Sequence, residues 1–387
     1  MSSGASNSND RPHGNFANFV RWIFLAALVY LLLIAVSTIG AGFARAAGER
    51  AKSLFDFAEN PFAGLVIGIV ATGLIQSSST VSSIIVGLVA GGLPVYIAVP
   101  MIVGSNIGTS VTNTIVSLGH IHVGEEFRRA FAAATIHDLF NLLAAAILLP
   151  LEILFHPLQR SAVYISEWLL GSGNIDVAAF DFMRAITRPT VRLITGATSS
   201  LPQLISGIVL IVIGIAMIFL SISFIGKLLR TLMVGKAKSL LQSSVARGPI
   251  AGIIVGTLIT VIVQSSSTTT SLIVPLAGTG VFSLRQVYAF TLGANIGTCF
   301  TALLAAMAVS GDDAIFALQI ALVHLLFNLF GILVVYGIPF LREIPIWGAQ
   351  RLADAAVKRK LYAVAYLLGL FFLIPAAVLT ISKFMGY

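Results

Sequence analysis

Hydrophobic residues run along this chain in long stretches, and polar residues interrupt them at only a few places. Because a helix rises about 1.5 Å per residue, roughly 20 apolar residues cross the hydrocarbon core of a bilayer. Seven stretches reach that length, and each predicts a membrane-crossing helix: residues 19–44, 93–118, 127–155, 203–226, 284–309, 313–340 and 360–383. The pattern therefore predicts an all-α polytopic membrane protein.

Two further apolar stretches end in the same polar block, QSSST. Residues 61–80 and 249–268 share ten identities in register, and these include the whole block. Two later motifs, Gly-x-Asn-Ile-Gly-Thr and His-x-Leu-Phe-Asn, also occur twice: 104–109 and 293–298, and 137–141 and 324–328. The offsets between copies are 188, 189 and 187 residues, which predicts a tandem duplication.

Basic residues at the ends of the apolar stretches indicate which loops face the cytoplasm. Loops 226–248 and 341–360 carry five Lys or Arg each, and such loops stay on the cytoplasmic side. The N-terminus and the loop around Arg128 join that side only if each QSSST segment enters and leaves the membrane by one face. We therefore predict re-entrant hairpins at residues 61–92 and 249–282, with a cytoplasmic N-terminus.

Each copy then has three full crossings, so the second copy is predicted to lie upside down relative to the first. Such inverted-topology repeats are typical of secondary transporters. The organisation predicted from the sequence is a flexible N-terminus at 1–18, repeat 1 at 19–155, an external linker at 156–202, repeat 2 at 203–340, a cytoplasmic connector at 341–359 and an extra C-terminal helix at 360–387.

Composition supports a membrane protein and argues against other classes. The chain is 57% apolar and only 10% charged, unlike a soluble globular domain. Its net charge of +8 is better explained by topology signals at loop ends than by nucleic-acid binding. The sequence has no P-loop, dinucleotide fingerprint or metal-ligand cluster, so we expect no cofactor and no ATP-driven step. The single cysteine, Cys299, excludes an intrachain disulfide.

Each QSSST block places hydroxyl and amide groups at the tip of a predicted hairpin. A helix that begins there exposes unpaired N–H groups and the positive end of its dipole, which together favour an anion. We predict that an oxyanion binds between the two blocks, through Gln76, Ser77, Ser78, Ser79, Thr80, Gln264, Ser265, Ser266, Ser267 and Thr268. The alternative is that these small residues only let helices pack closely, although packing alone would tolerate alanine.

The Asn-Ile-Gly-Thr motifs fall in the middle of predicted spans. Two glycines and an asparagine weaken a helix by roughly 2 kcal/mol, so we expect an unwound segment in each repeat. Carbonyl and hydroxyl oxygens at such breaks suit sodium, which gives the candidate ligands Asn106, Thr109, Ser110, Thr114, Asn295 and Thr298. The alternative is a kink that serves packing alone.

Asp138 is the only one of fifteen acidic residues deep within a predicted span. Burying it unpaired costs at least roughly 2.5 to 3.5 kcal/mol, and no Lys or Arg lies at comparable depth. Its partner is therefore a transported cation, a proton or the neighbouring His137. Asn141 shares its helix face and is a second candidate sodium ligand, as is Asn328 in the other copy, where Leu325 takes the place of the aspartate. A nucleophilic triad is not expected because Gly-x-Ser-x-Gly is missing, so the chain is not predicted to be an enzyme.

The duplicated QSSS blocks, GSNIGTSVTNT at 104–114 and EFRRAFAAATIHD at 126–138 resemble the type II sodium-dependent phosphate cotransporter family, in a compact bacterial-type form. The resemblance covers roughly residues 50–383. It implies symport of inorganic phosphate with sodium across the cell membrane by alternating access, with sodium as the coupling ion and phosphate between the two blocks. An aspartate at the position of Asp138 marks the family's electrogenic members.

Three positions depart from the animal pattern of that family. His120 and Val123 stand where Gln and Asp supply a sodium site, and Ala294 replaces a serine, which implies an altered sodium site. Two rival functions stay open from the residues alone. One is sodium symport of another oxyanion, such as sulfate, or of a dicarboxylate. The other is an anion channel or a non-transporting membrane scaffold, which predicts no dependence on sodium.

Overall fold

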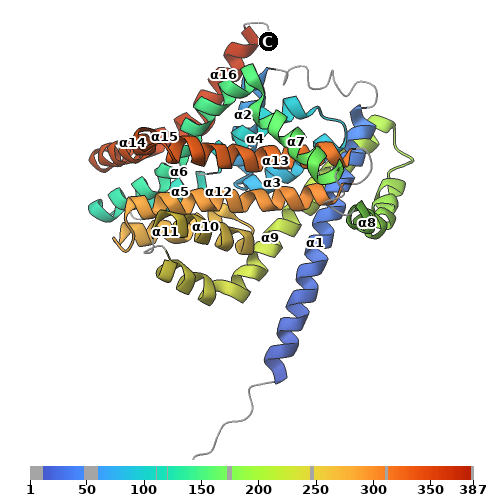
Figure 1. The fold of residues 1–387 in the computed structure, drawn as a ribbon, viewed down its shortest axis with the longest axis horizontal. Coiled ribbons are helices and arrows are strands. Elements are labelled where there is room, and N and C mark those ends of the chain that lie inside the picture. The colour runs from blue at the N-terminus through green and yellow to red at the C-terminus, as the bar shows by residue number, and fades with distance from the viewer. Residues whose placement is uncertain are drawn as a thin grey trace, which may run out of the picture.

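The computed structural model describes residues 12–47, 60–109, 111–119, 121–171, 177–244, 248–309 and 313–384, and all regular structure in these ranges is helical (Figure 1). Seven helical segments there are long and apolar enough to cross a membrane: Phe19–Ala46, Val95–Leu118, Gly124–Phe155, Gln203–Leu228, Leu284–Met307, Ala314–Tyr336 and Leu361–Val378. They coincide with the seven predicted stretches to within a few residues. The prediction of an all-α polytopic membrane protein is confirmed.

The two copies contain corresponding helices in the same order. The first copy consists of α1 (Pro12–Ala47), α2 (Pro61–Ile75), α3 (Ser78–Ala90), α4 (Val95–Gly108), α5 (Val111–Leu118) and α6 (Gly124–Phe155). The second consists of α9 (Gln203–Ser244), α10 (Pro249–Val263), α11 (Ser266–Gly278), α12 (Leu284–Met307), α13 (Ala314–Gly331) and the π-helix η4 (Ile332–Tyr336).

The segments outside the duplication are also largely helical. Between the copies lie α7 (Pro157–Gly171) and α8 (Val177–Ala197), and after them come α14 (Pro339–Lys358), α15 (Leu361–Leu368), the π-helix η5 (Gly369–Leu373) and α16 (Ile374–Phe384). Helix α14 packs along α6, and α16 packs against α2. The segments that follow the duplication therefore both contact its first copy.

Both QSSST blocks interrupt the helix in the same way. Gln76 and Gln264 adopt left-handed backbone conformations, with φ of 57° and 55°. A right-handed helix cannot continue through a residue in this conformation, so the preceding helix ends there. Ser77 and Ser265 then take extended conformations, and each side-chain Oγ accepts the N–H of the residue three positions later at 3.2 Å. Serine is a favoured N-cap, so the polar block itself encodes the break.

The motif glycines bring helices into backbone contact. A Cβ added to Gly104 would collide with the carbonyl oxygen of Leu65, and one added to Gly293 with that of Ile253. In this way α2 packs directly on α4, and α10 packs directly on α12. The helix cost of glycine is offset here by a close approach that no other residue permits.

This packing corrects one prediction about the Asn-Ile-Gly-Thr motifs. In the first copy α4 ends at Gly108 and α5 begins at Val111, and Ser110 between them lies outside the described residues, so an unwound segment there stays a prediction. In the second copy α12 is helical throughout residues 293–298, so the prediction of an unwound helix in each repeat is wrong for that copy. The reason is that its glycines provide room for α10, and the Thr298 hydroxyl donates to the carbonyl of Ala294 within the helix at 3.0 Å.

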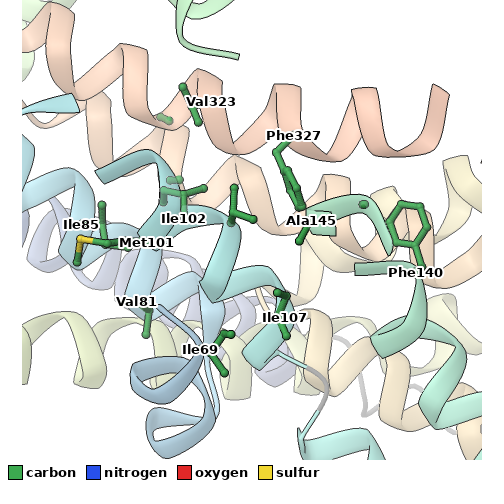
Figure 2. Packing of buried hydrophobic residues seen from close by; sticks show 14 of the residues in the cluster. Ile69, Val81, Ile85, Met101, Ile102, Ile107, Phe140, Ala145, Val323 and Phe327 are labelled. Atoms are coloured by element: carbon green, nitrogen blue, oxygen red, sulfur yellow. The ribbon is translucent and has the colours of Figure 1, made fainter. Parts of the chain in front are cut away.

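One large hydrophobic core includes residues from both copies and from the C-terminal helices. Figure 2 shows part of it, where Ile102 and Ile107 of α4, Phe140 of α6 and Phe327 of α13 gather between the helices. Helices α12 and α13 lie side by side (Figure 1). The buried polar residues described next lie on these same helices.

Candidate functional site

Hydrogen bonds join the predicted site residues of one copy to those of the other. Asn295 Nδ2 donates to Asn141 Oδ1 at 2.8 Å, and Asn328 Nδ2 donates to Asn106 Oδ1 at 3.1 Å. Asn141 Nδ2 in turn donates to the backbone carbonyl of Asn106 at 2.8 Å. All four asparagines are at most 3% exposed. Four predicted sodium ligands therefore form one buried amide network across the interface between the copies.

The structure does not bring all predicted sodium ligands into that network. The hydroxyls of Thr109 and Thr298 donate to carbonyls of their own helices, Ser105 at 2.9 Å and Ala294 at 3.0 Å. Ser110 and His120 lie outside the described residues. Of the other two departures, Val123 is exposed before α6, whereas Ala294 is fully buried in α12.

Asp138 is fully buried, and its carboxylate faces two hydroxyl groups. The Tyr366 hydroxyl donates to Oδ2 at 2.9 Å, and the Thr114 hydroxyl approaches the same oxygen at 3.5 Å. His137 hydrogen-bonds elsewhere, through Nε2 to Asn295 Oδ1 and through Nδ1 to Asn113 Nδ2 at 3.5 Å. These bonds do not support the alternative in which His137 serves as the structural partner of the aspartate.

Sequence reasoning missed two residues of this site, Tyr366 and Asn113. Tyr366 lies on α15, outside the duplication, so the comparison of copies could not mark it. Its signal was a polar hydroxyl in an otherwise apolar span, since a buried tyrosine O–H usually finds a partner. Asn113 links His137 to the second QSSST helix, because its Oδ1 accepts from the Thr270 hydroxyl at 2.7 Å. Neither residue belongs to a repeated motif.

The two QSSST blocks are similar in backbone but differ in their side-chain contacts. Gln264 is half-buried, and its Oε1 accepts from the Thr301 hydroxyl at 2.8 Å, whereas Gln76 is exposed. The Ser267 hydroxyl reaches the carbonyl of Thr109 in the first copy at 3.5 Å. Among the described residues no hydrogen bond joins the blocks directly, so a ligand between them stays a prediction.

The amides at the start of α3 and α11 are the groups best suited to an anion. The serine caps use only the N–H of Thr80 and of Thr268, while the first amides of a helix have no carbonyl partner within it. Ser78, Ser79 and Ser266 are at most 3% exposed. Each block therefore combines hydroxyl donors with the N-terminus of a 13-residue helix.

Membrane-crossing helices in two related copies, with asparagines buried at their interface and a carboxylate buried in the first copy, are typical of polytopic secondary transporters. The chain belongs to the Na+/Pi-cotransporter family, whose sequence model matches residues 31–185 and 217–339. This confirms the family resemblance drawn from the QSSS and Asn-Ile-Gly-Thr motifs.

Curated relatives match over most of the chain. Sodium-dependent phosphate transport protein 2A of Ovis aries is 35% identical, over 92% of this chain and 67% of its own length. The 2A protein of Mus musculus is 36% identical over the same shares. The 2B protein of Homo sapiens is 33% identical, over 95% of this chain and 66% of its own length. No solved structure matches.

Proposed function

We propose that this chain carries out sodium-coupled symport of inorganic phosphate across the cell membrane. The observation that carries the proposal is the pair of QSSST breaks, each built from a left-handed glutamine and a serine-capped helix, in a member of the Na+/Pi-cotransporter family. The curated relatives are sodium-dependent phosphate transport proteins by name. The chemistry of this site is binding and release, so its residues act as ligands rather than as catalysts.

Phosphate, in this proposal, binds to the hydroxyls and amides of Gln76–Thr80 and Gln264–Thr268. Helix N-termini and hydroxyl donors stabilise an anion without a fixed positive side chain, and such a site can also release it. The bond from Thr301 holds Gln264 in place. Gln76 is exposed, and in this proposal its side chain turns toward the substrate. The first copy therefore supplies an exposed glutamine and the second copy one that Thr301 holds.

Sodium, in this proposal, binds before phosphate, at the buried carboxylate and the buried asparagines. Asp138 supplies the negative charge, and Thr114, Asn141, Asn106, Asn295 and Asn328 supply neutral oxygens. The carboxylate is fully buried and hydrogen-bonded to Tyr366. Its Coulomb attraction for a cation is therefore stronger than that of a carboxylate at the surface. An aspartate at this position marks the electrogenic members of the family that the chain resembles, so transport is proposed to be electrogenic.

The membrane arrangement in this proposal follows from charge and repeat pattern. The QSSST segments are re-entrant hairpins, the two repeats have inverted topology, and the N-terminus is cytoplasmic. Short helices support this, because α2 and α10 have 15 residues each and α3 and α11 have 13, fewer than the roughly 20 that cross a bilayer. Rocking or sliding of the hairpin-bearing unit would give alternating access.

Uptake into proteoliposomes tests this function. Labelled phosphate should accumulate with an inward sodium gradient and not with an equal potassium gradient, whereas an anion channel would show no sodium dependence and no accumulation. Unlabelled phosphate should compete, and stronger competition by sulfate or a dicarboxylate would indicate the rival substrates.

The double variant Gln76→Ala, Gln264→Ala tests the phosphate site separately. We expect uptake to fall by about tenfold or more, as is typical when charged-group hydrogen bonds are lost. Gln203→Ala, at an exposed position at the start of α9, is the matched control and should retain uptake. Undiminished uptake in the double variant would overturn the placement of phosphate.

A further inference from the structure

A cavity of about 270 Å³ lies where α10 and α12 begin, and η4 and α14 complete its wall. Its lining includes Gly248, Pro249, Arg285, Tyr288, Tyr336 and Arg342. The QSSST block follows the opposite end of α10, about 22 Å away along a 15-residue helix at 1.5 Å per residue. The cavity has room for several waters at about 30 Å³ each, and it is separate from the site described above.

Positive charge dominates this cavity. Arg285 forms a bidentate pair with Glu343, at 2.8 and 2.7 Å. Arg342 lies 5.5 Å above the Tyr336 ring, and its ion pair with Glu343 Oε1 spans 3.9 Å. The Nε of Arg342 is buried and makes no hydrogen bond to any residue that the structure describes. Two guanidinium groups thus share one carboxylate, which leaves a net positive charge and an unused donor.

A second unused donor lies on α12, in the lining of the same cavity. Tyr288 is fully buried, and its hydroxyl has no hydrogen-bond partner within the described part of the chain. A buried hydroxyl without a partner is unfavourable, and a tyrosine O–H usually finds an acceptor when buried. The Tyr288 ring contacts the Tyr336 ring edge-on, with centroids 5.1 Å apart. Tyr336 is the last residue of the π-helix η4, a local form that frequently occurs at functional sites.

The start of α10 supplies backbone donors to the same place. Gly248 is its N-cap, with a φ of 112° and no side-chain capping bond, and Pro249 follows at the first helical position. A Cβ at Gly248 would meet no atom of the described residues within 4 Å. No described residue therefore fills the space beside the helix start, so a ligand can approach the first free amides, whose dipole end favours an anion.

The first copy lacks all of these features at the corresponding positions. Asn60 corresponds to Gly248, and its side chain caps α2 by accepting the N–H of Phe62 at 2.9 Å. Tyr96 corresponds to Arg285, and Val99 to Tyr288. The open helix start, the arginine and the buried hydroxyl thus occur together in the second copy only. The duplicated framework alone does not account for this combination.

We propose that this cavity binds a phosphate group, as the headgroup of an anionic phospholipid or as free phosphate. The arginine fork matches phosphate oxygens, Tyr288 donates its hydroxyl, and α10 donates its first amides. Glu343 holds Arg285 in position and leaves Arg342 to meet the ligand. A bound phosphate group ties the start of α10 to α14.

Binding to the purified full-length protein tests this proposal in the Gln76→Ala, Gln264→Ala background, which removes the predicted transport site. One arm measures retention of phosphatidic acid against phosphatidylcholine by native mass spectrometry. The other measures the shift of thermal unfolding by inorganic phosphate in lipid-free detergent. Retention of phosphatidic acid assigns a lipid headgroup, and stabilisation by inorganic phosphate without lipid retention assigns the free ion.

Two variants remove the proposed donors with little change of shape. Tyr288→Phe and Arg342→Gln should each weaken binding about tenfold, the loss expected for one charged-group hydrogen bond. Arg351→Gln is the control, because Arg351 is an exposed arginine on the same helix, over the Trp347 ring, and it should bind as the parent does. Equal binding by all four proteins would overturn the proposal, as would no binding of either probe. Unliganded unfolding temperatures show whether each variant is folded.

Discussion

The two copies of the duplication keep the same framework but differ in the polar groups built on it. Both have the left-handed glutamine, the serine cap and the glycine contacts between neighbouring helices. Only the first copy has the buried acid, Asp138, and only the second has the open helix start at Gly248. The shared parts form the breaks proposed to bind phosphate. The unshared parts are a charged side chain and the positive end of a helix dipole. We infer that the first determines coupling to sodium and that the second determines binding of a further anionic ligand.

The paired histidines show the same difference at one residue. His137 and His324 occupy matching positions, and both are fully buried. His137 hydrogen-bonds Asn295 and Asn113, whereas neither ring nitrogen of His324 has a hydrogen-bond partner among the described residues. Asn106, the counterpart of Asn295, instead accepts from Asn328. The histidine thus occupies the same position in both copies, but its ring makes hydrogen bonds only in the first copy, among the described residues.

The largest effect is expected at the acid that the second copy lacks. Asp138→Asn keeps the shape of the side chain and removes its charge, so the proposed sodium site loses its only carboxylate. We expect sodium-dependent phosphate currents to fall by about 100-fold, since removing one partner of a buried charge interaction costs roughly 3 kcal/mol or more. Voltage-clamped membranes or proteoliposomes with a potential dye give the measurement.

Glu125→Gln is the control for this change, because Glu125 is exposed and pairs with Arg128 at the surface. It removes one carboxylate charge from the same helix and should leave the current unchanged. Equal currents in Asp138→Asn and the parent protein would contradict the assignment of the coupling charge to the first copy.

A smaller effect is expected at Tyr366, which supports the acid from outside the duplication. Tyr366→Phe removes the hydroxyl that donates to Asp138 Oδ2 at 2.9 Å and keeps the ring that packs against Phe131 and Phe371. A hydrogen bond to a charged group contributes about 1.5 to 3 kcal/mol. We therefore expect the sodium concentration for half-maximal phosphate uptake to change by about tenfold or more.

The direction of that change separates two roles of the hydroxyl. A positioning role predicts weaker sodium binding with little change in phosphate affinity, whereas competition between Tyr366 and sodium for the carboxylate predicts tighter binding. Tyr362→Phe, at a more exposed position on α15, controls for loss of a hydroxyl from this helix. Sodium activation identical to that of the parent would show that Tyr366 does not act on the acid.

The features that depend on a few neighbouring residues could be predicted from the sequence. The QSSST breaks could be predicted because glutamine, serine and threonine ended an apolar run, and the buried acid stood out within a span. The continuous α12 could not, because its glycines are explained by contacts with α10 that are distant in sequence. The Tyr366 contact spans 228 residues, and no repeated motif points to it. The four asparagines of the network do lie in repeated motifs and were predicted singly, but the contacts that join them span 154 and 222 residues and could not be predicted.

The smallest effect is expected at His324, and its comparison with His137 is the sharpest test of the difference between the copies. His137→Leu removes hydrogen bonds to Asn295 and Asn113 and leaves these buried amides with fewer partners, which costs about 1 to 3 kcal/mol. His324→Leu removes no hydrogen bond of the ring. It should therefore change the unfolding free energy by less than about 0.5 kcal/mol, or raise it, because an apolar group replaces an unpaired polar one. Thermal unfolding in one detergent compares the two variants directly, and equal destabilisation would show that the histidines kept equivalent roles after the duplication.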